Sequence, residues 1–414
     1  MTRTILHSDL NAFYASVEMM LDPSLRGKAV AVCGSTEERH GIVLAKSELA
    51  KKAGIKTGMV NWEARKMCPG LIMVHPNYEQ YLKYSQLVRA IYYRYTDQVE
   101  PFGMDECWID VTGSAVMGTG EEIAEEIRQL VKEELGLTVS IGVSFNKIFA
   151  KLGSDMKKPD AITVITEDNF REKVWPLPAS DMIYVGRATS RKLEKYGIYT
   201  IGGIAATPPE TMRRWFGVNG LALWNFASGQ DHSRVMHRDF ESPVKSVGHG
   251  ITCNKDVHTE EEAWLVLLAL SQDIGHRLRI HDLAAGGVQL TVKDNDLEYR
   301  QCQAQLRLPT QSPLEIAQEA RRLLHCNYRW DKPVRALTVR GINLASQKNP
   351  LQWDFFNDAS RHEKRQTADD TVDMLRGRFG MNCIFPSSLV KHTLTEKSDP
   401  HDLVRMPGMM YQSN

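Results

Sequence analysis

The chain has 414 residues, enough for two to four domains, and its 42% hydrophobic and 25% charged residues are typical of a soluble globular protein. Its 51 Lys and Arg residues balance 51 Asp and Glu residues, which excludes a protein that is uniformly basic. No window reaches the roughly 18 apolar residues of a membrane helix, and no signal segment is recognisable. The seven scattered cysteines exclude a disulfide framework and a zinc ribbon. We therefore expect a cytoplasmic protein with no membrane span.

The first 75 residues predict a strand, a helix and a small inserted unit. Residues 4–9 form an apolar run that ends in Asp9, and residues 15–21 have helical character, so Asp9 is expected at a strand-to-helix junction. The inserted unit, residues 20–75, is expected to contain a strand at 29–33, a turn at 34–41 and a Lys-rich helix at 44–53.

The next segment predicts a larger core of strands and helices. Helical spacing covers residues 78–95 and 121–135, and strand-like runs cover residues 104–112 and 137–143. Mixed strands and helices of this kind indicate an α+β core.

The second half predicts short helices, a tether and another α+β domain. Short helical pieces fill residues 176–235, and residues 231–246 lack periodicity, as a tether between domains does. Beyond it, strands at 286–292 and 335–343 alternate with amphipathic helices at 260–280 and 312–324. One last helix is expected at 368–378.

Asp105 and Glu106 are adjacent acidic residues within an apolar run. In a regular strand they point to opposite faces, so that one would be exposed and the other ion-paired. A bulge or a strand end would instead let both carboxylates reach one metal ion.

Three blocks of sequence resemble the signature blocks of the Y-family DNA polymerases, the translesion enzymes of the impB/mucB/samB type. They occur in the expected order, and the resemblance extends over residues 1–345. The blocks are His7-Ser-Asp-Leu-Asn-Ala-Phe-Tyr-Ala-Ser-Val-Glu, Gly103-Met-Asp-Glu-Cys-Trp-Ile-Asp-Val-Thr and Ser140-Ile-Gly-Val-Ser-Phe-Asn-Lys-Ile-Phe-Ala-Lys-Leu-Gly-Ser-Asp-Met-Lys-Lys-Pro.

The resemblance implies an α+β multidomain fold, the right-hand polymerase with palm, small fingers, helical thumb and α+β little finger. It agrees with the boundaries drawn above. The expected domains are the palm (1–20 and 76–170), the fingers (21–75), the thumb (171–235), a linker (236–244), the little finger (245–345) and a C-terminal tail (346–414).

The resemblance also implies a two-metal site. Asp9, Asp105 and Glu106 would be the catalytic carboxylates, with Asp9 and Asp105 bridging two Mg²⁺ ions and Glu106 serving the catalytic one. The carbonyl of Leu10 would serve the nucleotide-bound ion. Mg²⁺ prefers oxygen ligands, and two ions about 4 Å apart stabilise both the entering and the leaving oxygen. Mn²⁺ is expected to substitute.

Four residues are expected at the deoxynucleoside triphosphate, namely Phe13, Tyr14, Lys51 and Lys158. Tyr14 corresponds to the family's steric gate against ribonucleotides, although a core aromatic is the alternative. The backbone N–H groups of Phe13 and Tyr14 lie at a helix start, which suits a phosphate. Lys158 matches a lysine that reaches the triphosphate, the alternative being a solvated side chain.

Two positions depart from the family pattern. Asn11 stands where a second Asp is frequent, and we expect activity to survive because metal ligation there uses Asp9 and a carbonyl. Glu48 and Lys51 stand where many members have Tyr and Arg. Lys51 keeps the charge, and a Lys at this position favours the mutagenesis branch that is similar to the UV-inducible type.

Residues 184–198 resemble a helix-hairpin-helix that grips DNA, although the Pro-Gly-x-Gly form of its turn is absent. Gly186, Arg187, Arg191 and Lys192 are the expected contacts to phosphate, giving attraction that weakens with salt. The alternative is a solvated helix face.

A short aromatic segment follows the expected little finger. It resembles the peptide Gln-Leu-Asp-Leu-Phe that binds the ring-shaped sliding clamp, with aromatics at both leucine positions. Packing against the little finger is the alternative. The segment consists of Gln352, Trp353, Asp354, Phe355 and Phe356.

These features predict an error-prone translesion DNA polymerase that binds primer-template DNA, deoxynucleoside triphosphates and the clamp as a monomer. A non-catalytic scaffold is the second hypothesis, and the intact carboxylates argue against it. A nucleotide cyclase with a related palm is the third, and the thumb, little finger and clamp-like peptide argue against that.

Overall fold

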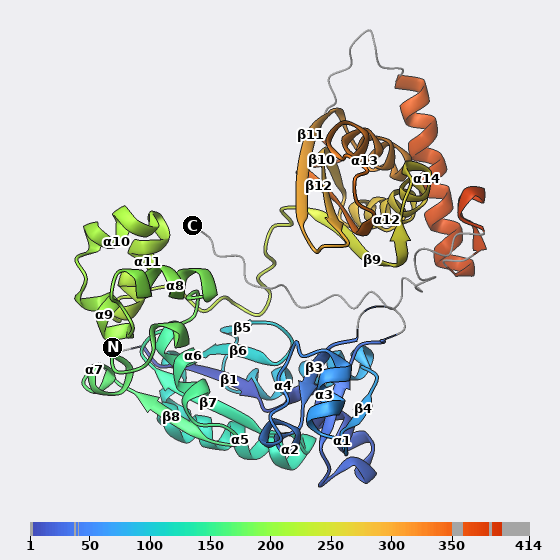
Figure 1. Cartoon of the computed structure of the whole chain (residues 1–414). Helices are drawn as coiled ribbons and strands as arrows, with labels where there is room; N and C mark the ends of the chain where they lie inside the picture. The colour runs from blue at the N-terminus through green and yellow to red at the C-terminus, as the bar shows by residue number, and fades with distance from the viewer. Residues whose placement is uncertain (1–2, 37–38, 40, 350–358, 381–382, 391–414) are drawn as a thin grey trace. The chain divides into compact units, whose positions relative to one another are not determined.

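The structure is a computed structural model that describes residues 3–36, 39, 41–349, 359–380 and 383–390. The chain divides into two compact units, and each is described by itself (Figure 1). Of the described residues, the first unit contains those up to Gly34 and Ile42–Ser242, and the second contains those of Ser35–Gly41 and those from Pro243 onwards.

A five-stranded sheet forms the centre of the first unit, in the order β5-β6-β1-β7-β8. Its strands are β1 (Ile5–Leu10), β5 (Val99–Pro101), β6 (Glu106–Asp110), β7 (Val139–Ser144) and β8 (Ile162–Ile165). Strand β1 is antiparallel to both of its neighbours, β6 and β7. The strand that carries Asp9 is therefore in the middle of the sheet.

Helices cover both faces of this sheet. On one face, α1 (Phe13–Leu21), α4 (Tyr78–Tyr92) and α5 (Gly120–Leu135) contribute apolar side chains to a shared core with Leu6, Ile109 and Ile141. On the other face, Ala150 of α6 (Lys147–Met156) packs against Ile5 and Trp108. Because side chains alternate along a strand, His7, Asp9, Glu106 and Trp108 share the α6 face.

A small three-stranded sheet in the order β3-β2-β4 lies between α1 and α4 in the sequence. Its elements are β2 (Val30–Cys33), β3 (Val43–Lys46), α2 (Glu48–Lys52), α3 (Asn61–Met67) and β4 (Ile72–Val74). The predicted helix at 44–53 is wrong in its first part, because residues 43–46 pair with β2 instead. Helix α2 begins after Ser47, whose hydroxyl accepts a hydrogen bond from the backbone of Ala50.

Short helices complete the first unit around their own apolar core. They are α7 (Phe170–Val174), α8 (Arg187–Lys195), α9 (Ile201–Ala206), α10 (Pro209–Phe216) and α11 (Val218–Ala227). This agrees with the short helical pieces expected from the sequence.

The second unit is a four-stranded antiparallel sheet in the order β11-β10-β12-β9, covered on one face by α12 (Glu260–Ile280) and α13 (Pro313–Asn327). Its strands are β9 (Val247–Val257), β10 (Leu283–Asp294), β11 (Tyr299–Thr310) and β12 (Val334–Ser346). Strands β9 and β11 are not predicted from the sequence. A further helix, α14 (Ala359–Phe379), is longer than the predicted segment.

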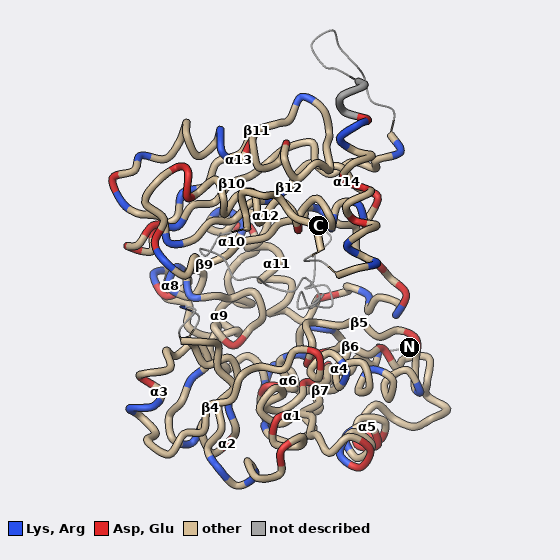
Figure 2. Tube along the Cα trace, turned by 90° about the vertical axis from the view of Figure 1, so that its right-hand side faces the viewer, with Lys and Arg blue, Asp and Glu red and all other residues tan. Residues whose placement is uncertain are grey.

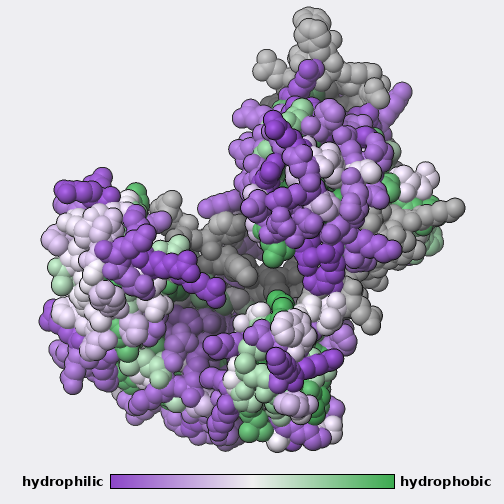
Figure 3. All heavy atoms as spheres, viewed as in Figure 1, coloured by the Kyte–Doolittle hydropathy of each residue, from purple (hydrophilic) through white to green (hydrophobic). Residues whose placement is uncertain are grey.

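Among the described helices, none combines the length and apolar composition needed to cross a bilayer. On the surface seen in Figure 3, hydrophilic residues predominate and hydrophobic ones form separate small patches.

Candidate active site

Asp9 and Glu106 are brought together by strand pairing. Asp9 is the residue directly opposite Glu106 in the antiparallel pair of β1 and β6, so both carboxylates leave the same face. Asp9 is buried, with 6% of its surface exposed. Burial raises the pKa of Asp9, and the neighbouring Glu106 raises it further.

Asp105 joins the other two because it lies before the strand rather than within it. Strand β6 begins at Glu106, and the carbonyl of Asp105 accepts a hydrogen bond of 2.9 Å from the N–H of Leu10. Burial raises the pKa of Asp105 to about 6, with Glu106 and Asp9 as the next causes. Of the arrangements considered from the sequence, the structure has the strand end.

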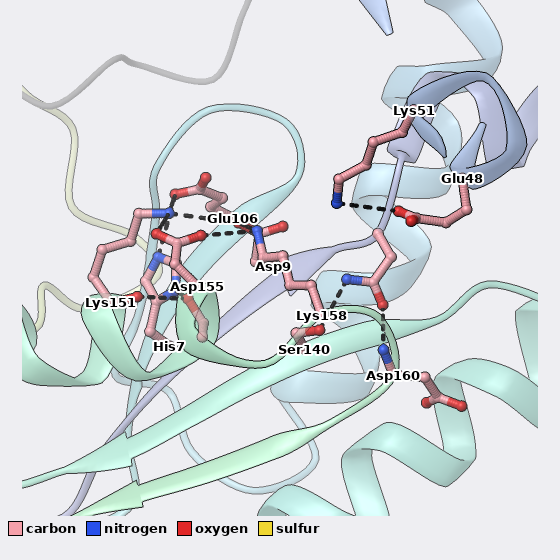
Figure 4. A network of polar contacts seen from close by, with 12 residues as sticks. His7, Asp9, Glu48, Lys51, Glu106, Ser140, Lys151, Asp155, Lys158 and Asp160 are labelled. Atoms are coloured by element: carbon pink, nitrogen blue, oxygen red, sulfur yellow. Dashed lines mark hydrogen bonds and ion pairs between the residues drawn. The ribbon is translucent and has the colours of Figure 1, made fainter. Parts of the chain in front are cut away.

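Two lysines converge on the carboxylates of Asp9 and Glu106 (Figure 4). The ammonium of Lys151 on α6 lies 2.8 Å from Glu106, 3.2 Å from Asp155 and 3.5 Å from Asp9. Lys158 lies 2.7 Å from Asp9 and 2.9 Å from Asp155. The sequence analysis missed Lys151, although its place in the third block, on the helix that covers the Asp9 face, was a usable signal.

The buried ring of His7 lies next to Glu106. The hydroxyl of Ser154 donates to the carbonyl of Lys151, so it accepts from Nδ1–H of His7 at 2.8 Å. The Nε2 of His7 then carries no proton and lies 3.3 Å from a carboxylate oxygen of Glu106, with no hydrogen bond between the two atoms. Burial, followed by the charge of Lys151, lowers the pKa of His7 well below its usual value, which agrees with a neutral ring.

Asn11 uses both ends of its amide for structure. Its Nδ2 donates to the hydroxyl of Ser140 at 2.9 Å, and its Oδ1 accepts from the N–H of Asp160 at 2.8 Å. An aspartate could not make the first of these bonds as a carboxylate. Asn11 therefore ties the end of β1 to the loop that follows Lys158.

The carboxylates match the chemistry of a divalent cation site, because Asp9, Asp105 and Glu106 gather like charge in a partly buried place. As placed here, the compensating charge comes from Lys151 and Lys158. Across the described residues, no group of three or more His, Cys, Asp or Glu side chains is arranged to hold a metal ion as it stands.

Comparisons with known proteins place this chain in a family. A sequence model of the impB/mucB/samB family matches residues 8–155, and one of that family's C-terminal domain matches residues 244–355. The chain is 48% identical over 381 residues to DNA polymerase IV of Acetivibrio thermocellus, covering 92% of this chain and 96% of that protein. It is 36% identical over 393 residues to DNA polymerase IV 1 of Bacillus subtilis, covering 94% of each.

The chain belongs to the Y-family DNA polymerases of the impB/mucB/samB type. A solved Y-family DNA polymerase chimera has the same fold, with a TM-score of 0.73 and 23% identity over 83% of this chain and 99% of that one. The relatives from Acetivibrio thermocellus and Bacillus subtilis are both named DNA polymerase IV. The branch similar to the UV-inducible type, which Lys51 favours, is therefore not the one these relatives represent.

In this Y-family polymerase, Tyr14 lies beside the carboxylates. Burial raises the pKa of Tyr14 to about 12, with Asp105 as the next cause, and its hydroxyl donates to the sulfur of Met104 at 3.7 Å. Helix α1 begins at Phe13 after Ala12, which has φ 48° and makes no side-chain cap. Ala12 therefore does not cap the first backbone N–H groups of α1. The expected contact with a phosphate requires these groups to be uncapped.

Glu48 and Lys51 lie on α2 and contact each other at 3.6 Å, both substantially exposed. Figure 4 shows this pair separate from the cluster around Asp9. Lys51 therefore has no contact with the carboxylates in this structure that would fix it at a nucleotide.

The turn before α8 contains one residue with a left-handed backbone conformation. Gly186 is the residue before α8, and Tyr184 has φ 73°, in the left-handed region that normally favours glycine. Arg187 and Arg191 are exposed on α8, where Figure 2 shows clustered Lys and Arg. Lys192 instead donates to the carbonyl of Trp215, and its ammonium lies 4.7 Å from the ring centre of Phe216.

The second unit has an open sheet face that the sequence analysis did not identify. Gln289 donates to Gln303 at 3.0 Å, and Thr291 donates to Gln301 at 3.3 Å, across β10 and β11. The same cross-strand rows continue into Arg340, Thr338, Gly248 and Gly250. These rows contain no carboxylate, and their amides, hydroxyls and backbone suit contacts with a phosphate chain. The face could not be predicted from the sequence, because the rows exist only when β9 and β11 are paired with β12 and β10.

The clamp-like segment 352–356 lies outside the described residues.

Proposed function

We propose that this chain extends DNA primers across damaged template positions by two-metal-ion nucleotidyl transfer, with low fidelity on intact DNA. Its family makes it a DNA-directed DNA polymerase, a nucleotidyltransferase. The observation that carries the proposal is that Asp9 and Glu106 lie opposite each other on β1 and β6, with Asp105 bonded through its carbonyl to Leu10 at the adjoining start of β6.

Asp9, Asp105, Glu106 and the carbonyl of Leu10 would hold two Mg²⁺ ions, which Mn²⁺ can replace. Such ions stabilise the charge that develops on the attacking and leaving oxygens during in-line displacement at phosphorus. The chain's own contribution is to fix the carboxylates on a rigid sheet and to supply positive charge from Lys151 and Lys158.

Phe13, Tyr14, Lys51 and Lys158 would bind the deoxynucleoside triphosphate. The ring of Tyr14 would occupy the space of a ribose 2′-hydroxyl and exclude ribonucleotides. Lys158 would leave Asp9 and Asp155 for the triphosphate once cations neutralise the carboxylates, because its present contacts are with the same charges. In the structure Lys158 contacts only carboxylates, so binding of the triphosphate by Lys158 requires these contacts to break.

Gly186, Arg187 and Arg191 would contact the DNA backbone, with Lys192 contributing through the packing of α8. The domains proposed from the sequence remain our assignment: palm, fingers, thumb and, beyond a linker at 236–244, a little finger. The open sheet face of the second unit supports a role for that domain on DNA.

We further propose that residues 352–356 bind the replicative sliding clamp and that the chain acts as a cytoplasmic monomer in DNA repair and damage tolerance. A clamp pull-down with Gln352→Ala, Phe355→Ala and Phe356→Ala combined is expected to lose binding while primer extension without the clamp persists.

Primer extension with Mg²⁺ on an intact template and on one with a single abasic site tests the function. We expect full extension on the first and insertion opposite the abasic site on the second. A protein that binds DNA without extending either primer would favour the scaffold, and extension that stops before the abasic site would contradict lesion bypass.

A further inference from the structure

Residues 231–238, here called the strap, follow α11 in the sequence and precede β9 of the second unit. They are fastened to the central sheet of the first unit. They form no helix or strand. Nevertheless, the N–H of Met236 donates to Glu100 at 3.0 Å, and the N–H of Arg238 donates to the carbonyl of Asp97 at 2.9 Å. The sequence had assigned this region to a tether because it lacks periodicity.

An apolar anchor adds to these hydrogen bonds. Val235 in the middle of the strap is 3% exposed and belongs to one buried cluster with Ile5, Trp108 and Ala150. Burial of a valine side chain stabilises the docked strap, since a free tether would leave it in water.

A buried ion pair lies where the strap meets the sheet. The ammonium of Lys147 is 2.7 Å from Glu100, and their side chains are 9% and 14% exposed. The same ammonium reaches the carbonyl of Arg234 at 3.5 Å and lies 4.4 Å from the ring centre of Trp108. Removing one partner of a buried pair leaves the other charge uncompensated.

The ion pair also borders Trp108 and His7, the residues that lie next to Glu106. The indole of Trp108 donates to the carbonyl of Lys147 at 2.9 Å, and its ring contacts that of His7 with centroids 5.2 Å apart. Trp108 is two residues beyond Glu106 on β6, and His7 faces Glu106 at 3.3 Å. Contacts therefore run without a break from the strap to a candidate catalytic carboxylate.

We propose that Glu100 and Lys147 are positioning residues. They hold the strap and, at the same time, fix Trp108 and His7, which lie next to Glu106. The segment that connects α11 to β9 is then held by the first unit as far as Arg238. The inference rests on the proposed nucleotidyl transfer for its effect on rate. Because a small misplacement of a catalytic group costs a large factor in rate, loosening this pair lowers kcat more than it changes nucleotide binding.

The test compares Glu100→Gln with wild type in the full chain, using limited trypsin digestion and single-nucleotide insertion. Trypsin cuts after Arg234 and Arg238 only when the strap opens, so the cleavage rate reports the open population. We expect cleavage there to rise about tenfold and kcat to fall about tenfold with the nucleotide KM within about twofold, since a buried pair is replaced by a neutral contact.

Two further variants keep the test decisive. Glu134→Gln removes a carboxylate that forms an exposed 2.6 Å pair with Arg94 on the same unit, and it is expected to match wild type in both assays. Val235→Ala loosens the strap without touching the ion pair, and it is expected to raise cleavage and lower kcat in the same direction. If either Glu100→Gln or Val235→Ala opens the strap while kcat stays at the Glu134→Gln level, the link to catalysis is overturned.

Unchanged cleavage in Glu100→Gln would overturn the anchoring itself. Thermal unfolding of each variant identifies a general loss of fold. If Glu100→Gln is unfolded, the cleavage rate and kcat of Val235→Ala test the proposal instead. Digestion needs no activity, so a wild-type chain that fails to extend primers would contradict the proposed function and leave the anchoring result readable.

Discussion

The ring of Tyr14 lies parallel to that of Tyr81, with centroids 4.2 Å apart and planes 8° apart. Tyr81 is fully buried, and its hydroxyl donates to Glu18 at 2.5 Å. The proposed gate thus rests against a fixed aromatic surface and cannot easily turn away from an incoming sugar.

Tyr14→Ala is expected to raise ribonucleotide insertion relative to deoxynucleotide insertion by about 100-fold, equal to about 3 kcal/mol, because the clash with the 2′-hydroxyl disappears. The ratio of kcat/KM for the two nucleotides measures it. Tyr81→Phe keeps the stacked ring and serves as the control, with a ratio close to wild type. An unchanged ratio in Tyr14→Ala would rule out the gate.

Lys158→Ala is expected to raise the KM for the incoming nucleotide by about tenfold, which corresponds to about 1.4 kcal/mol of lost phosphate binding. The neighbouring Lys157 is exposed, so Lys157→Ala is the matched control and should leave KM unaltered. Equal effects of the two changes would mean that Lys158 acts only through the general charge of the loop.

Helix α8 allows the DNA contacts to be separated from a packing contact. Arg187→Ala and Arg191→Ala are each expected to reduce the slope of log affinity against log salt by about 1, because each removes one phosphate contact. Lys192→Ala should change the slope little, since the ammonium of Lys192 is already bonded to Trp215. A salt titration of DNA binding provides the slopes, and a full unit lost in Lys192→Ala would contradict this division.

Asp373 fixes α14 to the second unit and makes that attachment sensitive to acid. Burial alone raises the pKa of Asp373, but the contact with His276 and the hydrogen bond from Arg279 outweigh it and bring the pKa to about 2. The bond to Arg279 is 2.6 Å, and the Asp373 side chain is 16% exposed. A lowered folded pKa means that the stabilisation is complete above pH 4 and is lost as the pH falls from about 4 towards 2.

Asp373→Asn is therefore expected to lower the free energy of opening of α14 by about 1 to 2 kcal/mol at pH 7, after allowance for partial solvent screening, and to differ little from wild type near pH 2. Hydrogen exchange of the α14 amides measures it. The exposed Asp370 on the same helix provides the control Asp370→Asn. A difference that persisted unchanged into acid would exclude the ionised carboxylate as its source.

Local patterns in the sequence were sufficient for much of the fold. Helices α4, α5 and α12 were predicted within a few residues because their apolar spacing is long and regular. Residues 44–46 were misassigned because a Lys-rich run resembles a helix, and only pairing with β2 makes it a strand. Strand β9 was missed because Gly248 and Gly250 weaken its alternation, whereas β11 was missed although polar and apolar residues alternate from Gln301 to Leu308.

The site was predictable where it rests on neighbours in sequence and strand order, and not where it rests on tertiary contacts. Asp9, Asp105 and Glu106 were identified from their blocks. The structural use of Asn11, the engagement of Lys192 with Trp215 and the strap held by Glu100 depend on residues distant in the chain. No spacing in the sequence reports such contacts.

The most direct test of the central claim is single-turnover primer extension with Mg²⁺ by Asp105→Asn/Glu106→Gln. Asp155→Asn is its matched control, because Asp155 shares Lys151 and Lys158 with the cluster but is not a proposed metal ligand. We predict that the double variant loses at least about 1000-fold in rate, on the scale of lost charge stabilisation at a transition state, while the control loses less than about tenfold. Extension by the double variant at a rate near that of the control would contradict the account.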